Sequence, residues 1–246
     1  MKRRWAGVAA VALGATAFGY LVSREDWWAV ALHWLFPSLP VVLFSSATLA
    51  ELVIQHLQIV LTSSAFTIAL GIPLGIWVTR ESGRDFRELV SATADLAQTF
   101  PPIAVLALVL PALGFGPAPA IVALSLYGLF PVVSGTVAGI DAVPRAVLEA
   151  ARGMGMGRWE ILRRVELPLA ARVIMGGVRT SVIINIGTAT VAAAAGAGGL
   201  GSPIISGINT QNGALLLEGA AAAAMLAVLA DAALDRAEEL LTPSSQ

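Results

Sequence analysis

The sequence predicts an all-α protein that crosses a membrane several times. Hydrophobic residues make up 57% of the 246-residue chain, only 13% of residues are charged, and the mean hydropathy is +0.81. An average soluble chain carries about 25% charged residues, and abundant Gly and Ala let membrane helices approach closely. The net charge of −1 implies no bulk attraction to nucleic acid. The lack of cysteine excludes disulfides and thiolate metal sites.

Residues 1–50 are expected to form an N-terminal transmembrane helix and an outer interfacial segment. The chain opens with a basic KRRW stretch and continues apolar to residue 22. We prefer an uncleaved span to a secretory signal peptide, because no clear small-x-small cleavage site precedes the next apolar run. Residues 27–49 hold Trp27, Trp28 and Trp34, and Trp concentrates at membrane–water interfaces. A second span over these residues is the main alternative.

Five further apolar runs are long enough to cross a bilayer at roughly 20 residues each. They cover residues 52–78, 89–110, 120–140, 174–195 and 214–234. In the second of these runs, Pro101 and Pro102 should break the helix, which a membrane tolerates only where the backbone is buried in protein or lines a cavity. The sequence therefore predicts six spans, one N-terminal and five within residues 51–240.

The positive charges indicate how these spans are oriented. With six spans, the cations on one side are Lys2, Arg3, Arg4, Arg80, Arg84, Arg87, Arg145, Arg152, Arg158, Arg163, Arg164, Arg172 and Arg236. Arg24 is the loop cation on the other side. Because cytoplasmic loops carry an excess of Lys and Arg, both termini are predicted to be cytoplasmic. A seventh span at residues 27–49 would remove this asymmetry.

Residues 141–170, here called the polar segment, interrupt the apolar chain. They carry five arginines and four acidic residues. Pro144 stands where a helix could begin, and three glycines, Gly153, Gly155 and Gly157, stand where it would end, since Pro favours the first turn and Gly the position past the last. A second short helical run then extends to Pro168, which should close it. The polar segment is predicted to be two short helices joined by a glycine bend on the cytoplasmic side.

The spacing within the polar segment resembles a known signature. Glu149-Ala150-Ala151 is followed after three residues by Gly155, and after nine more by Val165-x-Leu167-Pro168. This pattern is similar to the EAA signature of permease subunits of binding-protein-dependent ABC importers, with Val165 in place of Ile. The surrounding EAARGMGM and VELPLA look most like the osmoprotectant subfamily. Weaker matches in the right order extend the resemblance over about residues 52–238; they are Gly71-x-Pro73-Leu74-Gly75, Thr79-Arg80, Gln98-Thr99-x-Pro101, Leu126-Tyr127-Gly128-Leu129-x-Pro131, Gly187-x-Ala189-Thr190 and residues 196–201.

The resemblance implies a five-helix importer core at residues 51–240 and a transport subunit, not an enzyme. By this resemblance, the polar segment would contain the coupling helix that docks on an ABC ATPase subunit, with Glu149 and Gly155 at the centre of the docking contact. The docking residues implied are Glu149, Ala150, Ala151, Gly153, Gly155, Leu167 and Pro168. The chain has no phosphate-cradling G-x-x-x-x-G-K-[ST] motif, so ATP and Mg²⁺ are expected on the partner ATPase, and no cofactor or metal on this chain.

The resemblance further implies a place in the prokaryotic plasma or inner membrane and several partners. These are ABC ATPase subunits, an extracytoplasmic substrate-binding protein, and a second permease copy or a homologous permease. The cargo would be a small osmoprotectant such as glycine betaine or choline, moved inward by alternating access. Another small solute, such as an amino acid, is the first alternative. A secondary transporter driven by an ion gradient is the rival class, and it would need more intramembrane carboxylates than this chain offers.

Nine residues are candidates for the pathway or its gate: Asp95, Gln98, Thr99, Pro101, Asn185, Thr188, Thr190, Gly198 and Gly199. An acidic residue inside a span is a functional candidate by default. Asp95 could therefore act in the pathway, cap its helix near the cytoplasm, or pair with Arg179 at a similar depth. Asn185 and the two threonines of the same run could line the pathway, although hydrogen bonds between helices are slightly favoured.

Residues 196–201 also match the dinucleotide fingerprint G-x-G-x-x-G, with Glu218 about 20 residues further on. We reject that function, because a membrane-length apolar run precedes the motif where a strand is required. A tight outer turn or part of an outer gate is preferred. His33 and His56 are predicted to be interfacial and not metal ligands. The tryptophans do not cluster in mid-membrane as a cage for a quaternary ammonium would require, so selectivity is expected to lie in the binding protein.

Overall fold

The structure is a computed structural model that describes residues 2–241, except for the side chains of residues 2–6, 94, 95, 97, 98 and 241. Within this part of the chain all regular structure is helical, as predicted. The elements in order are α1 (Lys2–Val22), α2 (Glu25–Leu35), α3 (Leu49–Val78), η1 (Arg84–Phe86), α4 (Arg87–Thr99), α5 (Pro102–Leu113), α6 (Pro117–Asp141), α7 (Arg145–Gly153), α8 (Arg158–Ile161), η2 (Leu162–Glu166), α9 (Leu167–Ala189), η3 (Val191–Ala195), α10 (Gly201–Thr210) and α11 (Gly213–Leu241).

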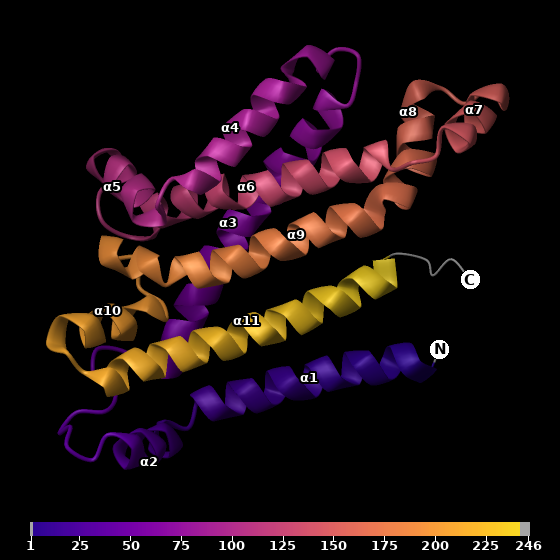
Figure 1. The fold of residues 1–246 in the computed structure, drawn as a ribbon. Coiled ribbons are helices and arrows are strands. Elements are labelled where there is room, and N and C mark those ends of the chain that lie inside the picture. Colours follow the sequence, from indigo (N-terminus) through magenta and orange to yellow (C-terminus); the bar gives the residue numbers. More distant parts are fainter. Residues whose placement is uncertain (1, 242–246) are drawn as a thin grey trace.

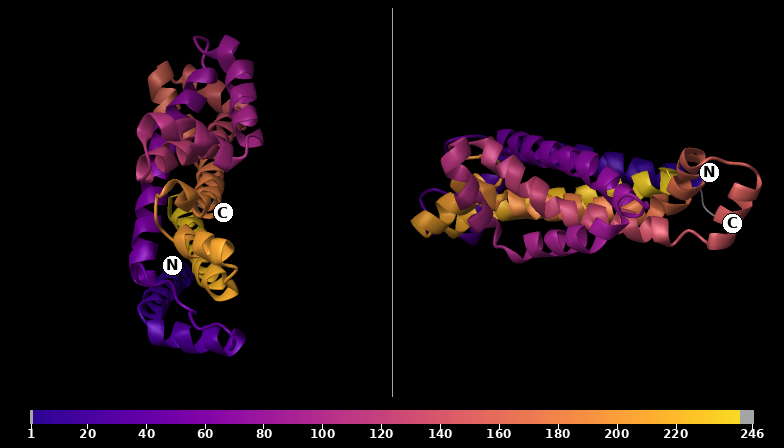
Figure 2. Two further views of the ribbon diagram at one scale, coloured as in Figure 1. Left: turned by 90° about the vertical axis from the view of Figure 1, so that its left-hand side faces the viewer. Right: turned by 90° about the horizontal axis from the view of Figure 1, so that it is seen from above.

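The long helices α1, α6, α9 and α11 lie side by side, and α3 crosses them obliquely (Figure 1). Helix α1 begins and α11 ends at the end of the molecule that carries α7 and α8, here called the inner end. Helices α2 and α10 lie at the opposite, outer end, and the view from above shows the same division (Figure 2). This arrangement is the one expected if both termini and the polar segment share one side of a membrane.

Within the described part of the chain, four continuous helical stretches are long and apolar enough to cross a membrane: Leu49–Val78, Pro117–Asp141, Arg158–Ala189 and Gly213–Leu240. Helices α1 and α2 would together make a fifth, although the chain bends by 73° between them. The six-span count therefore stays a prediction. Residues 36–48, which follow α2, form no regular element.

The helix break predicted at Pro101 and Pro102, within the apolar run of residues 89–110, is confirmed. Helix α4 ends at Thr99, Phe100 and Pro101 are extended, and α5 starts at Pro102. The cause is local: a residue before proline is pushed out of the α region, and proline offers no N–H to continue the helix. The predicted second span of the importer core is thus made of two short helices, α4 and α5.

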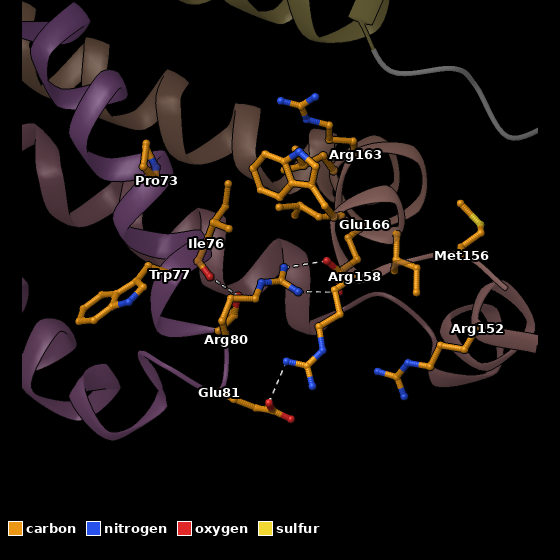
Figure 3. A pocket seen from close by; sticks show the side chains of 15 residues that line it. Pro73, Ile76, Trp77, Arg80, Glu81, Arg152, Met156, Arg158, Arg163 and Glu166 are labelled. Atoms are coloured by element: carbon orange, nitrogen blue, oxygen red, sulfur yellow. Dashed lines mark hydrogen bonds and ion pairs between the residues drawn. The ribbon is translucent and has the colours of Figure 1, made fainter.

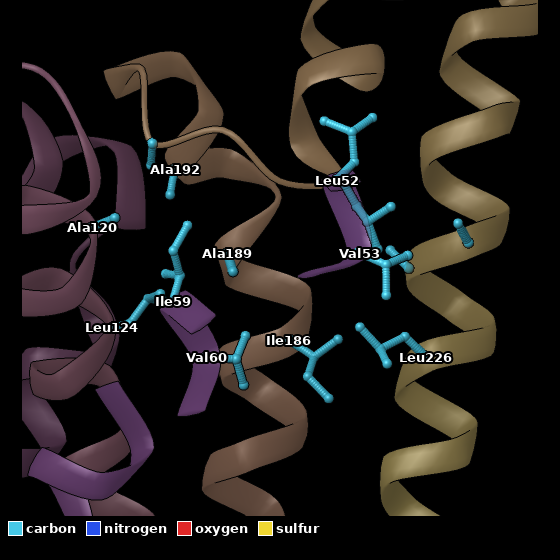
Figure 4. Packing of buried hydrophobic residues seen from close by; sticks show 14 of the residues in the cluster. Leu52, Val53, Ile59, Val60, Ala120, Leu124, Ile186, Ala189, Ala192 and Leu226 are labelled. Carbon is cyan, nitrogen blue, oxygen red and sulfur yellow. The ribbon is translucent and has the colours of Figure 1, made fainter. Parts of the chain in front are cut away.

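The apolar core lies between α3, α6, α9 and α11 in the outer half of the molecule (Figure 4). Leu52, Leu124 and Ile186 are each almost fully buried in it. Small residues set the spacing of the helices, because a Cβ added at Gly177 of α9 would lie 2.4 Å from the carbonyl oxygen of Pro131 in α6. Close backbone approach of this kind is typical of helix pairs in membranes.

Candidate functional site

The polar segment forms a helical hairpin that projects from the inner end of α6 and α9 (Figure 1). Pro144 is extended and α7 begins directly after it, as predicted. Helix α7 ends at Gly153, and Gly155 has a φ of +81°. That left-handed conformation is the one glycine adopts at little steric cost, and it turns the chain towards α8. The first predicted helix and the glycine bend that follows it are confirmed.

The docking residues implied by the resemblance lie mainly on the outside of this hairpin. Glu149, Ala150, Gly153 and Gly155 are exposed, whereas Ala151 is buried. A Cβ added at Gly153 or Gly155 would meet no atom within 4 Å, so the space above the bend is open. Ala150, Gly153 and Gly155 are small as well as exposed, so a partner could approach the backbone closely there. Leu167 and Pro168 lie apart from these residues, at the start of α9.

Pro168 does not end a helix, contrary to the prediction. Helix α8 continues through the π-turn η2 into α9, and the N–H of Leu167 donates to the carbonyl of Leu162, five residues earlier. Proline removes one N–H from the ladder and its ring clashes with the carbonyl four residues before it. The wider π-turn accommodates both effects, so the helix runs on with one extra residue in the turn.

A cavity of about 1040 Å³ separates the inner end of α3 from α8 and η2 (Figure 3). Two ion pairs cross between these elements beside it. Arg80 donates to both carboxylate oxygens of Glu166, at 2.7 and 3.2 Å. Arg158 pairs with Glu81 at 3.0 Å, and both of these side chains are at least 80% exposed. The cavity is therefore bridged by one protected ion pair and one solvated ion pair.

Sequence reasoning missed Glu166 and used Arg80 only as a topology marker and as part of a weak motif. Glu166 occupies the variable position between Val165 and Leu167 of the signature, where nothing signals a role. The one hint of a role for Arg80 was its position directly after an apolar run, where a charged residue can fix the end of a span.

The pathway candidates do not form one cluster. The side chains of Asp95 and Gln98 lie outside the described residues. Thr99 donates to Leu96 of its own helix at 2.8 Å, and Pro101 precedes α5. Thr188 and Thr190 lie near the outer end of α9, and Thr190 bonds within its own turn.

Asn185 is fully buried between α9 and α3. Its amide donates to the hydroxyl of Ser64 at 3.3 Å and lies 3.5 Å from that of Ser63. This agrees with the favoured interpretation, a hydrogen bond between helices, and not with a pathway lining.

The glycines of residues 196–201 connect η3 to α10. Gly198 and Gly199 have φ values of +79° and +73°, and the N–H of Gly199 donates to Gln55 of α3 at 3.0 Å. A helical turn precedes the motif where the dinucleotide fingerprint needs a strand, so the tight outer turn is the better description. Glu218 is buried, and its carboxylate accepts a hydrogen bond from the N–H of Phe44 at 2.9 Å.

Arg179 and His56 have partners that the sequence did not indicate. Arg179 donates to Asp231 at 2.6 and 2.7 Å and to Asp235 at 2.6 Å, both on α11. The side chain of Asp95, the partner suggested from the sequence, lies outside the described residues. Helix α9 packs along α11 at this depth, which brings these carboxylates within reach. His56 is fully buried, and its Nε2 lies 3.0 Å from the carbonyl oxygen of Ile186 in α9. No group of three metal-ligating side chains occurs among the side chains described.

Comparison with known proteins agrees with this architecture. The family model described as "Binding-protein-dependent transport system inner membrane component" matches residues 71–245. The osmoprotectant import permease protein OsmY of Salmonella typhimurium is 43% identical over 72% of this chain and 75% of its own length. Its counterpart OsmW is 40% identical over 79% of this chain and 92% of its own length. The glycine betaine/carnitine/choline transport system permease protein OpuCD of Bacillus subtilis is 40% identical over 77% and 82% of the two chains.

A solved structure shares the fold. One inward-facing crystal form of the MetNI methionine ABC transporter aligns with a TM-score of 0.70 over 78% of this chain and 95% of that chain, at 24% identity.

Proposed function

Because the chain belongs to the family of inner membrane components of binding-protein-dependent transport systems, we propose that it carries a small osmoprotectant, such as glycine betaine or choline, into the cell. It is a multi-pass permease subunit of an ABC importer in a prokaryotic cell membrane, and not itself an enzyme. The cargo assignment depends on one observation, namely that relatives at about 40% identity across most of the chain are named for these solutes.

The exposed surface of the polar segment is the proposed ATPase-docking site. Glu149, Ala150, Gly153 and Gly155 face open space at the inner end, and Ala151 holds α7 against the rest of the hairpin. Leu167 and Pro168, also residues of the signature, lie apart from this surface at the start of α9. ATP and Mg²⁺ would bind on the partner ATPase. Cargo would arrive from an extracytoplasmic binding protein at the outer end, and a second permease copy or a homologous permease would complete the pathway.

Alternating access requires two states of the permease that bind the partners differently. A ligand shifts such an equilibrium only by its differential affinity for the two states. Nucleotide would act through the ATPase on the polar segment, and the cargo-loaded binding protein would act on the outer end. Thr99, Pro101, Thr188, Thr190, Gly198 and Gly199 stay candidates for the pathway or its outer gate, as do Asp95 and Gln98.

Reconstitution tests this proposal directly. The chain, its co-purifying ATPase and candidate binding proteins would be placed in proteoliposomes, and uptake of labelled glycine betaine, choline and methionine would be followed with and without ATP. We expect ATP-dependent uptake of a quaternary ammonium solute, unaffected by dissipating ion gradients. ATP-dependent uptake of methionine alone would support the amino-acid alternative. Uptake that needs an ion gradient and no ATPase would contradict the ABC mechanism.

A further inference from the structure

The π-turn ahead of Pro168 determines where Glu166 points. One extra residue in a turn rotates the preceding chain by about 100° relative to the helix that follows, which is the angle per residue of an α-helix. Glu166 is the last residue of this turn and is buried, although it carries a charge. Its carboxylate points to the inner end of α3, where Arg80 meets it (Figure 3). Turns of this type occur frequently at functional sites.

The contact between Arg80 and Glu166 has the geometry of a rigid connection. Both terminal nitrogens of the guanidinium donate to both oxygens of the carboxylate, and such forked pairs fix orientation as well as distance. The side chain of Glu166 is 8% exposed and that of Arg80 is 33% exposed. Arg80 follows the end of α3 by two residues, so the fork connects α3 to the junction between the polar segment and α9.

The neighbouring ion pair provides a contrast. Arg158 and Glu81 join the same two parts of the chain at 3.0 Å, but both are solvated. Exposed pairs of this kind contribute little, because water screens them and the side chains lose freedom when they pair. A force applied to α7 and α8 would therefore reach α3 through Arg80 and Glu166 and not through Arg158 and Glu81.

We propose that Arg80 and Glu166 are positioning residues that make α3 move with the polar segment, so that ATP hydrolysis on the docked ATPase drives transport. This inference rests on the proposed docking of the ATPase at the polar segment. Without the fork, the hairpin of α7 and α8 can tilt across the cavity while α3 stays in place. The ATPase would then still bind and turn over, but fewer of its cycles would move cargo.

The test measures the number of ATP molecules hydrolysed per glycine betaine imported, in proteoliposomes that hold the complete complex and its binding protein. Glu166→Gln removes the charge but keeps the size of the side chain. The double variant Arg80→Gln/Glu166→Gln leaves no unpaired charge, so it separates the loss of the fork from the burial of a lone arginine. Glu81→Gln breaks the solvated pair and is the matched control.

We expect both fork variants to co-purify with the ATPase as the wild type does and to need about fivefold more ATP per solute, the factor that corresponds to about 1 kcal/mol of lost coupling free energy. The control should match the wild type. If the double variant hydrolysed as much ATP per solute as the wild type, the proposal would be overturned. Glu166 would then serve only to neutralise the charge of Arg80, and the fork itself would not be needed for coupling. An equally uncoupled Glu81→Gln, or loss of ATPase co-purification in either fork variant, would also overturn the proposal. Failure of the proposed function itself would be seen separately, as no ATPase association with the wild type.

Discussion

The crossing of α6 and α9 offers a sharp test of the packing, because two adjacent glycines there have different surroundings. A Cβ at Gly177 would lie 2.4 Å from the carbonyl oxygen of Pro131 and 3.2 Å from the Cα of Gly135, whereas one at Gly176 would meet nothing within 4 Å. Alanine in a helix interior is favoured over glycine by about 1 kcal/mol. Gly176→Ala should therefore stabilise the protein by up to about 1 kcal/mol.

Gly177→Ala gains the same helix propensity but must push two backbones apart. Overpacking of a tight site costs about 1–3 kcal/mol, so the two variants should differ in free energy of unfolding by about 2 kcal/mol, with Gly177→Ala the less stable. For a chain of this size, that corresponds to a difference in Tm of roughly 4–8 °C. The measurement is thermal unfolding of both variants in the same detergent. Equal Tm values, or a higher one for Gly177→Ala, would refute the close approach of α6 and α9.

Three further predictions concern the docking surface, the charges near the inner end and the topology. Gly155→Trp should leave the protein in the membrane but abolish co-purification of the ATPase. Gly155→Ala adds backbone strain of about 1 kcal/mol without bulk, so it should retain co-purification. Normal co-purification of the Gly155→Trp variant would remove the docking assignment. Arg179→Ala and Asp231→Ala should destabilise the protein non-additively in a double-mutant cycle, with a coupling energy of about 1 kcal/mol, and simple additivity would contradict the network between α9 and α11. A reporter enzyme active only outside the cytoplasm should be active when fused after Ser206, and a cytoplasmic signal there would exclude the proposed orientation.

Features with a local cause were predictable from the sequence. Pro144 and Gly155 determine where α7 begins and how the chain turns after it, because each acts through its own backbone. The signature spacing indicated the family, and the docking surface that it implies stays a prediction. The break at Pro101 was also foreseen, but its extent was not, since the length of α5 depends on what packs around it.

Features that depend on tertiary contacts could not be predicted. The charge of Arg179 was evident, but which carboxylate it meets depends on the rotation of α9 relative to α11. The burial of His56 depends on how α3 packs against α9, where its ring meets the carbonyl of Ile186. The role of Glu166 depends on a π-turn, which a proline alone does not specify, because prolines more often kink or end a helix.

The oblique course of α3 has a consequence for how the other long helices can move (Figure 1). At the outer end, Gln55 accepts a hydrogen bond from Gly199, and His56 contacts the carbonyl of Ile186. At the inner end, Arg80 is joined to Glu166. A helix that crosses the other long helices obliquely and is bonded to them at both of its ends resists their sliding past one another. Shear between these helices therefore requires α3 to rotate with them or to release one of its attachments.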